Sequence, residues 1–178
     1  MKYPGPKLEE SSCYRQPMED GQWDHLLQDL RAKLQDKNWD EIRALARTIR
    51  ERVEWLDPIM DRYCEITRHD CDDPCCLGRK IFYNRTDMLY LVALDFMPPP
   101  GQTRINALAP CRYLTAGGCN LPRIIRPYIC VWFLCEAHME ILREETVPFQ
   151  RRLLNTLQEI RGHRLRLESI YEWHYPEG

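Results

Sequence analysis

The sequence predicts a mainly α-helical fold in which helical arms pack around a loop-rich centre. Three observations lead to this prediction: apolar residues recur at helical spacing near both ends, prolines and glycines interrupt the middle, and cysteines concentrate in that middle. The length of 178 residues suits a single domain. We divide it into N-terminal helices over residues 1–63, a cysteine-cluster core over 64–135 and a C-terminal helical arm over 136–178.

Two helices are expected in the N-terminal part. The first follows Gly21 and carries leucines at helical spacing, namely Leu26, Leu27, Leu30 and Leu34. The second begins near Asn38 or Asp40, and its apolar stripe advances in steps of four and three: Ile42, Ala46, Ile49, Val53, Leu56, Met60 and Tyr63. Because Pro58 lies inside this second pattern, we expect a kink or a break near Asp57.

The C-terminal arm has a similar stripe. Its helical pattern starts at Glu136 and is expected to restart at Pro148, since proline is favoured in the first turn of a helix. The apolar side consists of Phe149, Leu153, Leu157, Ile160, Leu167 and Tyr171. Five arginines occupy the remaining surface, which is either a solvated face or a docking face for an acidic partner or RNA: Arg151, Arg152, Arg161, Arg164 and Arg166.

The middle part predicts short elements joined by loops. Asn84 or Thr86 is expected to cap a short helix over residues 87–96, and the prolines at 98–100 then require an extended connection. Residues 103–123 are expected to form a loop with at most a short hairpin. A further short helix is expected over residues 126–138, with Pro127 in its first turn.

The composition argues against several classes of protein. The formal net charge of −2 leaves no basic footprint, so we expect no nucleic-acid partner that binds through bulk charge. The longest apolar run, residues 128–135, is far shorter than the roughly 20 residues of a membrane span, and no membrane association is expected. The first residues lack the apolar stretch of a signal peptide. We therefore expect a cytoplasmic protein.

Nine cysteines are many for a domain expected in the cytoplasm. Cys13 stands apart, and the other eight are Cys64, Cys71, Cys75, Cys76, Cys111, Cys119, Cys130 and Cys135. Because a reducing compartment disfavours structural disulfides, such a cluster more often holds metal or carries redox chemistry. The alternatives are small buried hydrophobic residues or a disulfide framework. We predict that all eight ligate metal and form the core around which the helical arms pack.

The spacing of the cysteines bears on the kind of metal. Thiolates are soft donors that select zinc, copper(I) or iron–sulfur clusters. The sequence has no C-x-x-C pair, which zinc ribbons and dithiol oxidoreductases typically use. The adjacent Cys75 and Cys76 diverge, so they serve different centres, or one of them ligates while the other packs. The spacing slightly favours an iron–sulfur cluster over Zn²⁺, and both stay open.

Other residues near the cluster qualify as supporting groups. His69 and His138 lie within three residues of a cysteine and are weaker candidate ligands. A four-thiolate site is negatively charged and needs cations or backbone N–H groups nearby. The candidate cations are Arg79, Lys80, Arg112, Arg123 and Arg126, of which Arg126 is the best placed because it precedes Pro127.

The ordered series of cysteine motifs resembles a known family. It consists of C-x3-C-C ending at Cys76, then Cys111-Arg112-Tyr113-Leu114, then Gly118-Cys119, then Arg126-Pro127-x2-Cys130-x4-Cys135. This series is similar to that of the YkgJ-like cysteine-cluster family, described as zinc- or iron-chelating domains. The family usually begins with C-x2-C-x2-C-C, whereas this chain has the longer spacing Cys64-x6-Cys71-x3-Cys75-Cys76.

The resemblance implies metal binding by these cysteines and no agreed reaction. Some relatives in the family resemble flagellin lysine methylases. We expect a metal-binding protein that holds an iron–sulfur cluster or zinc as a redox or structural module, and whose helical arms dock a protein partner. The alternative is an enzyme that uses the cluster, either an oxidoreductase or a methylase-like group-transfer protein. No phosphate loop or dinucleotide fingerprint accompanies the cysteines, and no catalytic residue can be named.

Overall fold

The computed structural model describes residues 16–35, 39–67, 81–106 and 108–175. Within these ranges the protein is mainly helical, as the sequence predicts, and its only sheet is a two-stranded hairpin. The elements in chain order are α1 (Asp20–Gln35), α2 (Asp40–Thr67), α3 (Arg85–Ala93), β1 (Leu114–Thr115), β2 (Gly118–Cys119), the 3-10 helix η4 (Arg123–Ile125), α4 (Ile129–Trp132), α5 (Glu136–Glu144) and α6 (Val147–His174).

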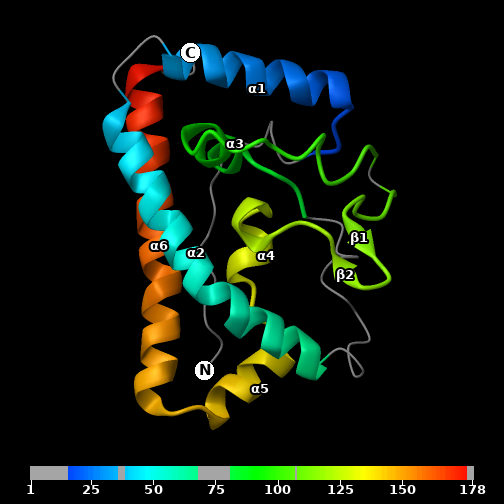
Figure 1. Ribbon diagram of the computed structural model, residues 1–178, viewed down its shortest axis with the longest axis vertical. Helices are drawn as coiled ribbons and strands as arrows, with labels where there is room; N and C mark the ends of the chain where they lie inside the picture. The colour runs from blue at the N-terminus through cyan, green and yellow to red at the C-terminus, as the bar shows by residue number, and fades with distance from the viewer. Residues whose placement is uncertain (1–15, 36–38, 68–80, 107, 176–178) are drawn as a thin grey trace.

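Helices α2 and α6 run antiparallel, side by side, along one edge of the molecule (Figure 1). The predicted stripe of α2 is confirmed, because all seven of its apolar residues are buried. In α6 the buried side includes the predicted Leu153, Leu157, Ile160, Leu167 and Tyr171. Exposed ion pairs join the two helices, each worth at most about 1 kcal/mol; they connect Arg166 to Glu41 and Arg52 to Glu159. Arg62 of α2 pairs with Glu145, which follows α5.

Pro58 lies inside α2 without ending it. The helix is continuous over Asp40–Thr67 and bends about midway along its length (Figure 1). A proline removes one helical hydrogen-bond donor and crowds the preceding turn, which accounts for a bend at this point. The predicted kink is therefore present and the predicted break is not. The second half of α2 turns toward the loops of the middle part and carries Cys64 with it.

Helix α3 lies at the centre of the fold, and all nine of its residues are buried. The predicted cap at Asn84 is confirmed: its side chain accepts the Asp87 N–H at 2.8 Å, and the Asp87 carboxylate accepts the Asn84 N–H at 3.0 Å. Helix α1 packs across α3 (Figure 1). Its fully buried Trp23 donates its indole N–H to the Pro99 carbonyl at 2.8 Å and lies 5.2 Å from the Tyr83 ring.

The single helix predicted over residues 126–138 is wrong. Over these residues the chain instead forms α4 and the start of α5, with extended backbone at Phe133 and Cys135. The side chain of Asp87 binds the backbone N–H of Tyr128 at 3.1 Å, so this contact with α3 fixes the chain just before α4. The extended residues then carry the chain from α4 to α5, away from the centre of the molecule (Figure 1).

The hairpin predicted within residues 103–123 is confirmed as a very short one. Leu114 pairs with Cys119 and Thr115 with Gly118 in antiparallel register.

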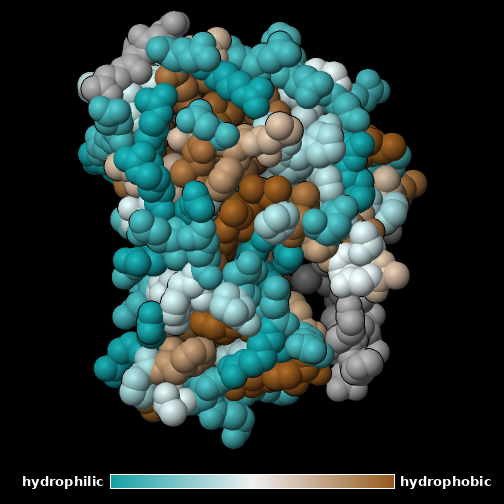
Figure 2. Space-filling model, in the orientation of Figure 1, coloured by the Kyte–Doolittle hydropathy of each residue, from teal (hydrophilic) through white to brown (hydrophobic). Residues whose placement is uncertain are grey.

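The face of the molecule seen in Figure 2 has apolar surface at its centre, over α4, and hydrophilic surface along α2. No helix in the described ranges is both long and apolar enough to cross a membrane.

Candidate metal centre

The structure describes five of the eight cysteines predicted as ligands. Cys64 is in the last turn of α2, Cys130 is in α4, and Cys135 is the residue that precedes α5. Cys111 and Cys119 lie on either side of the hairpin turn and are partly buried against the apolar core. All five have free thiols. Three predicted ligands, Cys71, Cys75 and Cys76, lie outside the described residues, as do Cys13, His69, Arg79 and Lys80.

A buried guanidinium connects the cysteine-bearing elements. Arg123 of η4 is 3% exposed and donates its Nε to Asp57 Oδ1 at 2.9 Å and its Nη2 to Asp61, both on α2. Its Nη1 donates to the backbone carbonyl of Cys130 at 3.0 Å. One side chain thus fixes α4 against the half of α2 that ends near Cys64.

The candidate supporting cations differ in how the structure holds them. Arg126, which the sequence favours, is partly exposed and donates its Nε to the Leu121 carbonyl at 2.7 Å; its charge, like that of Arg123, lowers the pKa of the Cys64 thiol. Arg112 is exposed and paired with Asp20, the first residue of α1. The sequence offers no signal that singles out Arg123, because its partners lie on a helix more than sixty residues away.

The thiol of Cys64 lies within electrostatic range of Cys135 and Arg123. Cys64 is an exposed residue by area, but protein atoms crowd its thiol enough that burial is the main cause of its raised pKa. The charges of Asp61 and Cys135 raise this pKa further, while Arg123 opposes them. Residues from the end of α2, from η4 and from the start of α5 are therefore close enough to influence one another's ionisation.

Cys119 and Cys130 lie within electrostatic range of a buried phenol, that of Tyr83. Burial is the main cause of the strongly raised pKa of Tyr83; the charges of Tyr113 and Asp87, and after them those of Cys130 and Cys119, add to it. The Tyr83 hydroxyl donates to the Ile125 carbonyl at 2.6 Å, at the end of η4. Tyr83 therefore hydrogen-bonds to the last residue of η4, and Arg123, the first residue of η4, hydrogen-bonds to the carbonyl of Cys130.

His138 is the candidate ligand that the structure makes more prominent. It lies in the first turn of α5, is 6% exposed, and its ring is 5.8 Å from that of Tyr63. Its Nδ1 has no hydrogen-bond partner among the described residues. Burial, and secondarily the charge of Arg123, lowers the pKa of His138, which favours the neutral imidazole that binds metals.

The described residues bring donors near one another without closing a coordination sphere. In the part of the chain that the structure describes, no three Cys, His, Asp or Glu side chains group closely enough to hold a metal ion. The donor types, free thiols with a neutral imidazole, are those that zinc and iron–sulfur centres use. Comparisons of the chain with protein-family models, curated proteins and solved structures found no match.

The arginines of α6 do not form one continuous face. Arg164 is buried and pairs with Asp87 of α3 at 2.8 Å, so its assignment to an exposed face is corrected. Arg166 is exposed and pairs with Glu41. Arg151 and Arg152 are exposed near the beginning of the helix, and both line a groove.

Proposed function

We propose that the protein binds a metal centre through its clustered cysteines and acts as a redox or structural module. The observation that supports this proposal best is the placement of Cys64, Cys130 and Cys135. They come from the end of α2, from α4 and from the residue that precedes α5. Arg123 hydrogen-bonds to α2 and to the Cys130 carbonyl, and its charge acts on the Cys64 thiol and on His138 of α5. Packing of small buried residues would not require a buried arginine to organise the same region.

The charge around Arg123 also favours a cation. Its single positive charge faces two carboxylates, those of Asp57 and Asp61, so this local group is net negative before any thiol ionises. Arg123 therefore positions the cysteine-bearing elements, and its charge lowers the pKa of the Cys64 thiol without outweighing the effect of burial. A bound metal ion would reduce the repulsion between ionised thiols and these carboxylates.

The proposed ligands are the eight clustered cysteines, and the metal is an iron–sulfur cluster or Zn²⁺. His138 is a candidate replacement for one thiolate because its buried Nδ1 has no partner among the described residues. We also propose that the chain is a YkgJ-like cysteine-cluster protein, on the motifs that surround Cys111, Cys119 and Cys130. An iron–sulfur cluster would supply electron transfer, and Zn²⁺ would supply a structural crosslink.

The test is metal and acid-labile sulfide analysis, with a visible spectrum, on protein purified without oxygen. Iron with sulfide and visible absorption identifies a cluster, and stoichiometric zinc without colour identifies a structural site. Cys130→Ser and Cys75→Ser should each lower the metal content, with Cys13→Ser as the matched control. Far-UV circular dichroism checks that the variants keep their helices. Unchanged metal content in both Cys130→Ser and Cys75→Ser, or no metal in the parent protein, would refute the proposal.

A further inference from the structure

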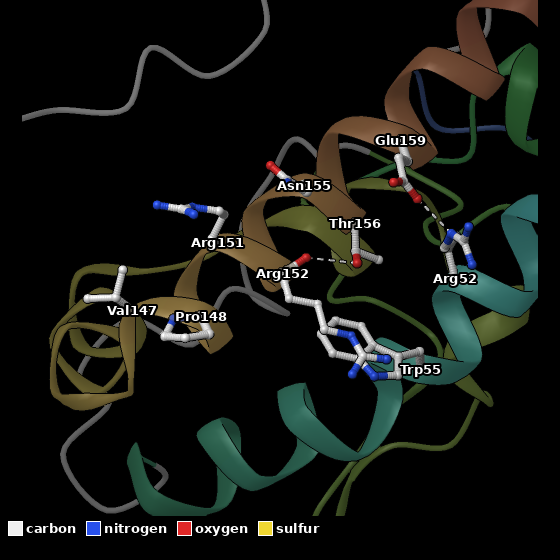
Figure 3. A pocket seen from close by; sticks show the side chains of 9 residues that line it. All are labelled: Arg52, Trp55, Val147, Pro148, Arg151, Arg152, Asn155, Thr156 and Glu159. Atoms are coloured by element: carbon white, nitrogen blue, oxygen red, sulfur yellow. Dashed lines mark hydrogen bonds and ion pairs between the residues drawn. The ribbon is translucent and has the colours of Figure 1, made fainter.

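A groove separates the beginning of α6 from the middle of α2 and has a volume of about 560 Å³ (Figure 3). None of its lining residues is a cysteine, so it is separate from the candidate metal centre. Three arginines line it, Arg52, Arg151 and Arg152, together with one acidic residue, Glu159. Its lining therefore carries an excess of positive charge, on a protein whose net charge is −2.

One arginine of the groove, Arg152, stacks on an aromatic ring. Its guanidinium lies over the ring of Trp55, 4.4 Å from the centroid, and the two side chains meet across the groove (Figure 3). Trp55 is half-buried and packs near Phe149 at 6.4 Å between ring centroids, so the platform is held from both helices. Stacking uses the flat face of a guanidinium and leaves the N–H groups at its edge available to an acceptor.

The other two arginines differ in how they are engaged. Arg52 donates its Nε to Glu159 at 2.7 Å and closes one end of the groove. Arg151 is exposed and makes no hydrogen bond or ion pair within the described ranges; it extends outward near Val147 and Pro148 (Figure 3). Val147 is 63% exposed, so an apolar side chain lies beside the unpaired cation.

We propose that this groove binds an acidic segment of a partner protein. Carboxylates of the segment accept hydrogen bonds from Arg151 and Arg152, and an apolar side chain of the segment packs against Val147 and Trp55. Arginine is suited to this role because its planar fork matches a carboxylate with two parallel hydrogen bonds. The chemistry is that of a short peptide with alternating acidic and apolar residues.

A nucleic acid fits the groove less well. A phosphate backbone needs a continuous basic surface, and here Glu159 lies inside the groove and pairs with one of its three arginines. The net charge of −2 also gives no long-range attraction for a polyanion. A peptide, unlike a phosphate backbone, can carry acidic residues beside Arg151 and Arg152 and uncharged residues beside Glu159.

The test measures binding by fluorescence anisotropy, at low and moderate salt. The probe is a fluorescein-labelled peptide that alternates glutamate with leucine; the same peptide with glutamine for glutamate and a labelled single-stranded RNA are the comparison ligands. The groove variant is R151E with R152E. The matched control is R31E with R47E, which makes the same change of charge at exposed arginines outside the groove.

We expect the groove variant to weaken binding of the acidic peptide by about tenfold or more, and the control to change it by less than about twofold. R151E alone, which leaves the Arg152–Trp55 stack intact, should weaken binding in the same direction. The glutamine peptide should bind poorly. Absence of binding by the acidic peptide, equal weakening in both double variants, or tighter binding of the RNA would overturn the proposal. Metal content is expected to be the same in all these variants.

Discussion

The guanidinium of Arg164 on α6 and the carboxylate of Asp87 on α3 form an ion pair at 2.8 Å, with their side chains only 6% and 4% exposed. The same guanidinium donates to Asn84 Oδ1 at 3.2 Å and lies 4.2 Å from the centroid of the Tyr128 ring. Asp87 in turn accepts the backbone N–H of Tyr128. This pair therefore connects α6, the cap of α3 and the chain that enters α4.

The first prediction concerns that pair. Arg164→Ala leaves the Asp87 carboxylate buried without its charge partner, and we expect a loss of about 3–5 kcal/mol in the free energy of unfolding. Urea unfolding followed by circular dichroism measures it. Arg166→Ala is the control, because the pair of Arg166 with Glu41 is exposed and its loss should cost about 1 kcal/mol or less. Equal losses in the two variants would show that burial of the pair has no special effect.

The second prediction concerns the hairpin that positions Cys119. Gly118 has a φ of +106°, a conformation that residues with a side chain rarely adopt. We expect Gly118→Ala to destabilise the protein by about 1–3 kcal/mol. Gly117→Ala is the neighbouring control, since its added Cβ would lie 3.7 Å from Thr115 Oγ1, an ordinary contact. Thermal unfolding of the two variants decides the point, and a melting temperature that falls equally in both would contradict it.

The third prediction separates positioning from charge at Arg123. Arg123→Lys keeps a positive charge but loses the planar fork that reaches Asp57, Asp61 and the Cys130 carbonyl together. We expect a loss of about tenfold or more in metal affinity, measured by competition with a chelator. Arg126→Lys removes the bond to a single carbonyl and should have a smaller effect. Equal affinities in Arg123→Lys and the parent protein would remove Arg123 from the proposed centre.

The fourth prediction concerns alkaline pH. Burial is the main cause of the raised pKa of Tyr90, so the unfolded chain loses this proton from about pH 10 while the folded chain retains it. The resulting stability is present below about pH 10 and is lost as the pH rises toward the folded pKa. Tyr90→Phe removes the titration, and also removes a hydroxyl with no partner among the described residues.

We therefore expect the free energy of unfolding of Tyr90→Phe to lie within about 1 kcal/mol of that of the parent protein at neutral pH. Above about pH 10 the variant should lose less stability than the parent protein. Urea unfolding at both pH values measures the difference. Tyr113→Phe provides the comparison: burial raises the pKa of Tyr113 to about 12, but its hydroxyl donates to the Gly101 carbonyl, so this variant should lose stability at neutral pH as well. Parallel pH profiles for Tyr90→Phe and the parent would count against the argument.

Periodicity predicts the faces of the long helices well in this protein. The stripe from Ile42 to Tyr63 is buried throughout, because an amphipathic helix has one way to cover its apolar side. The same periodicity also places Arg164 on the buried side of α6, because it follows Ile160 by four residues and precedes Leu167 by three. The assignment of Arg164 to an exposed face from the sequence does not use this spacing. An arginine at such a position predicts a buried acidic partner, although not which one.

Local sequence predicts the middle part less completely. The cap at Asn84 and the hairpin are local features, and both are confirmed. The break near Phe133 has no proline or glycine to mark it; the backbone is extended at Phe133, where α4 ends, and again at Cys135, where α5 begins. The hydrogen bonds of Arg123 to Asp57 and to the Cys130 carbonyl also cannot be predicted from local sequence, because they depend on how α2 and α4 pack in the folded protein.

The antiparallel packing of α2 against α6 has a consequence for the order of assembly. Apart from Cys64, every proposed ligand lies in the chain between these two helices, and their contact brings the ends of that chain together. Closing a loop restricts the conformations of everything inside it, at an entropic cost that grows only slowly with loop length. Helix packing thus offsets part of the cost of collecting donors from distant positions. Under the proposed metal binding, the ion would join donors from a segment whose two ends α2 and α6 hold together.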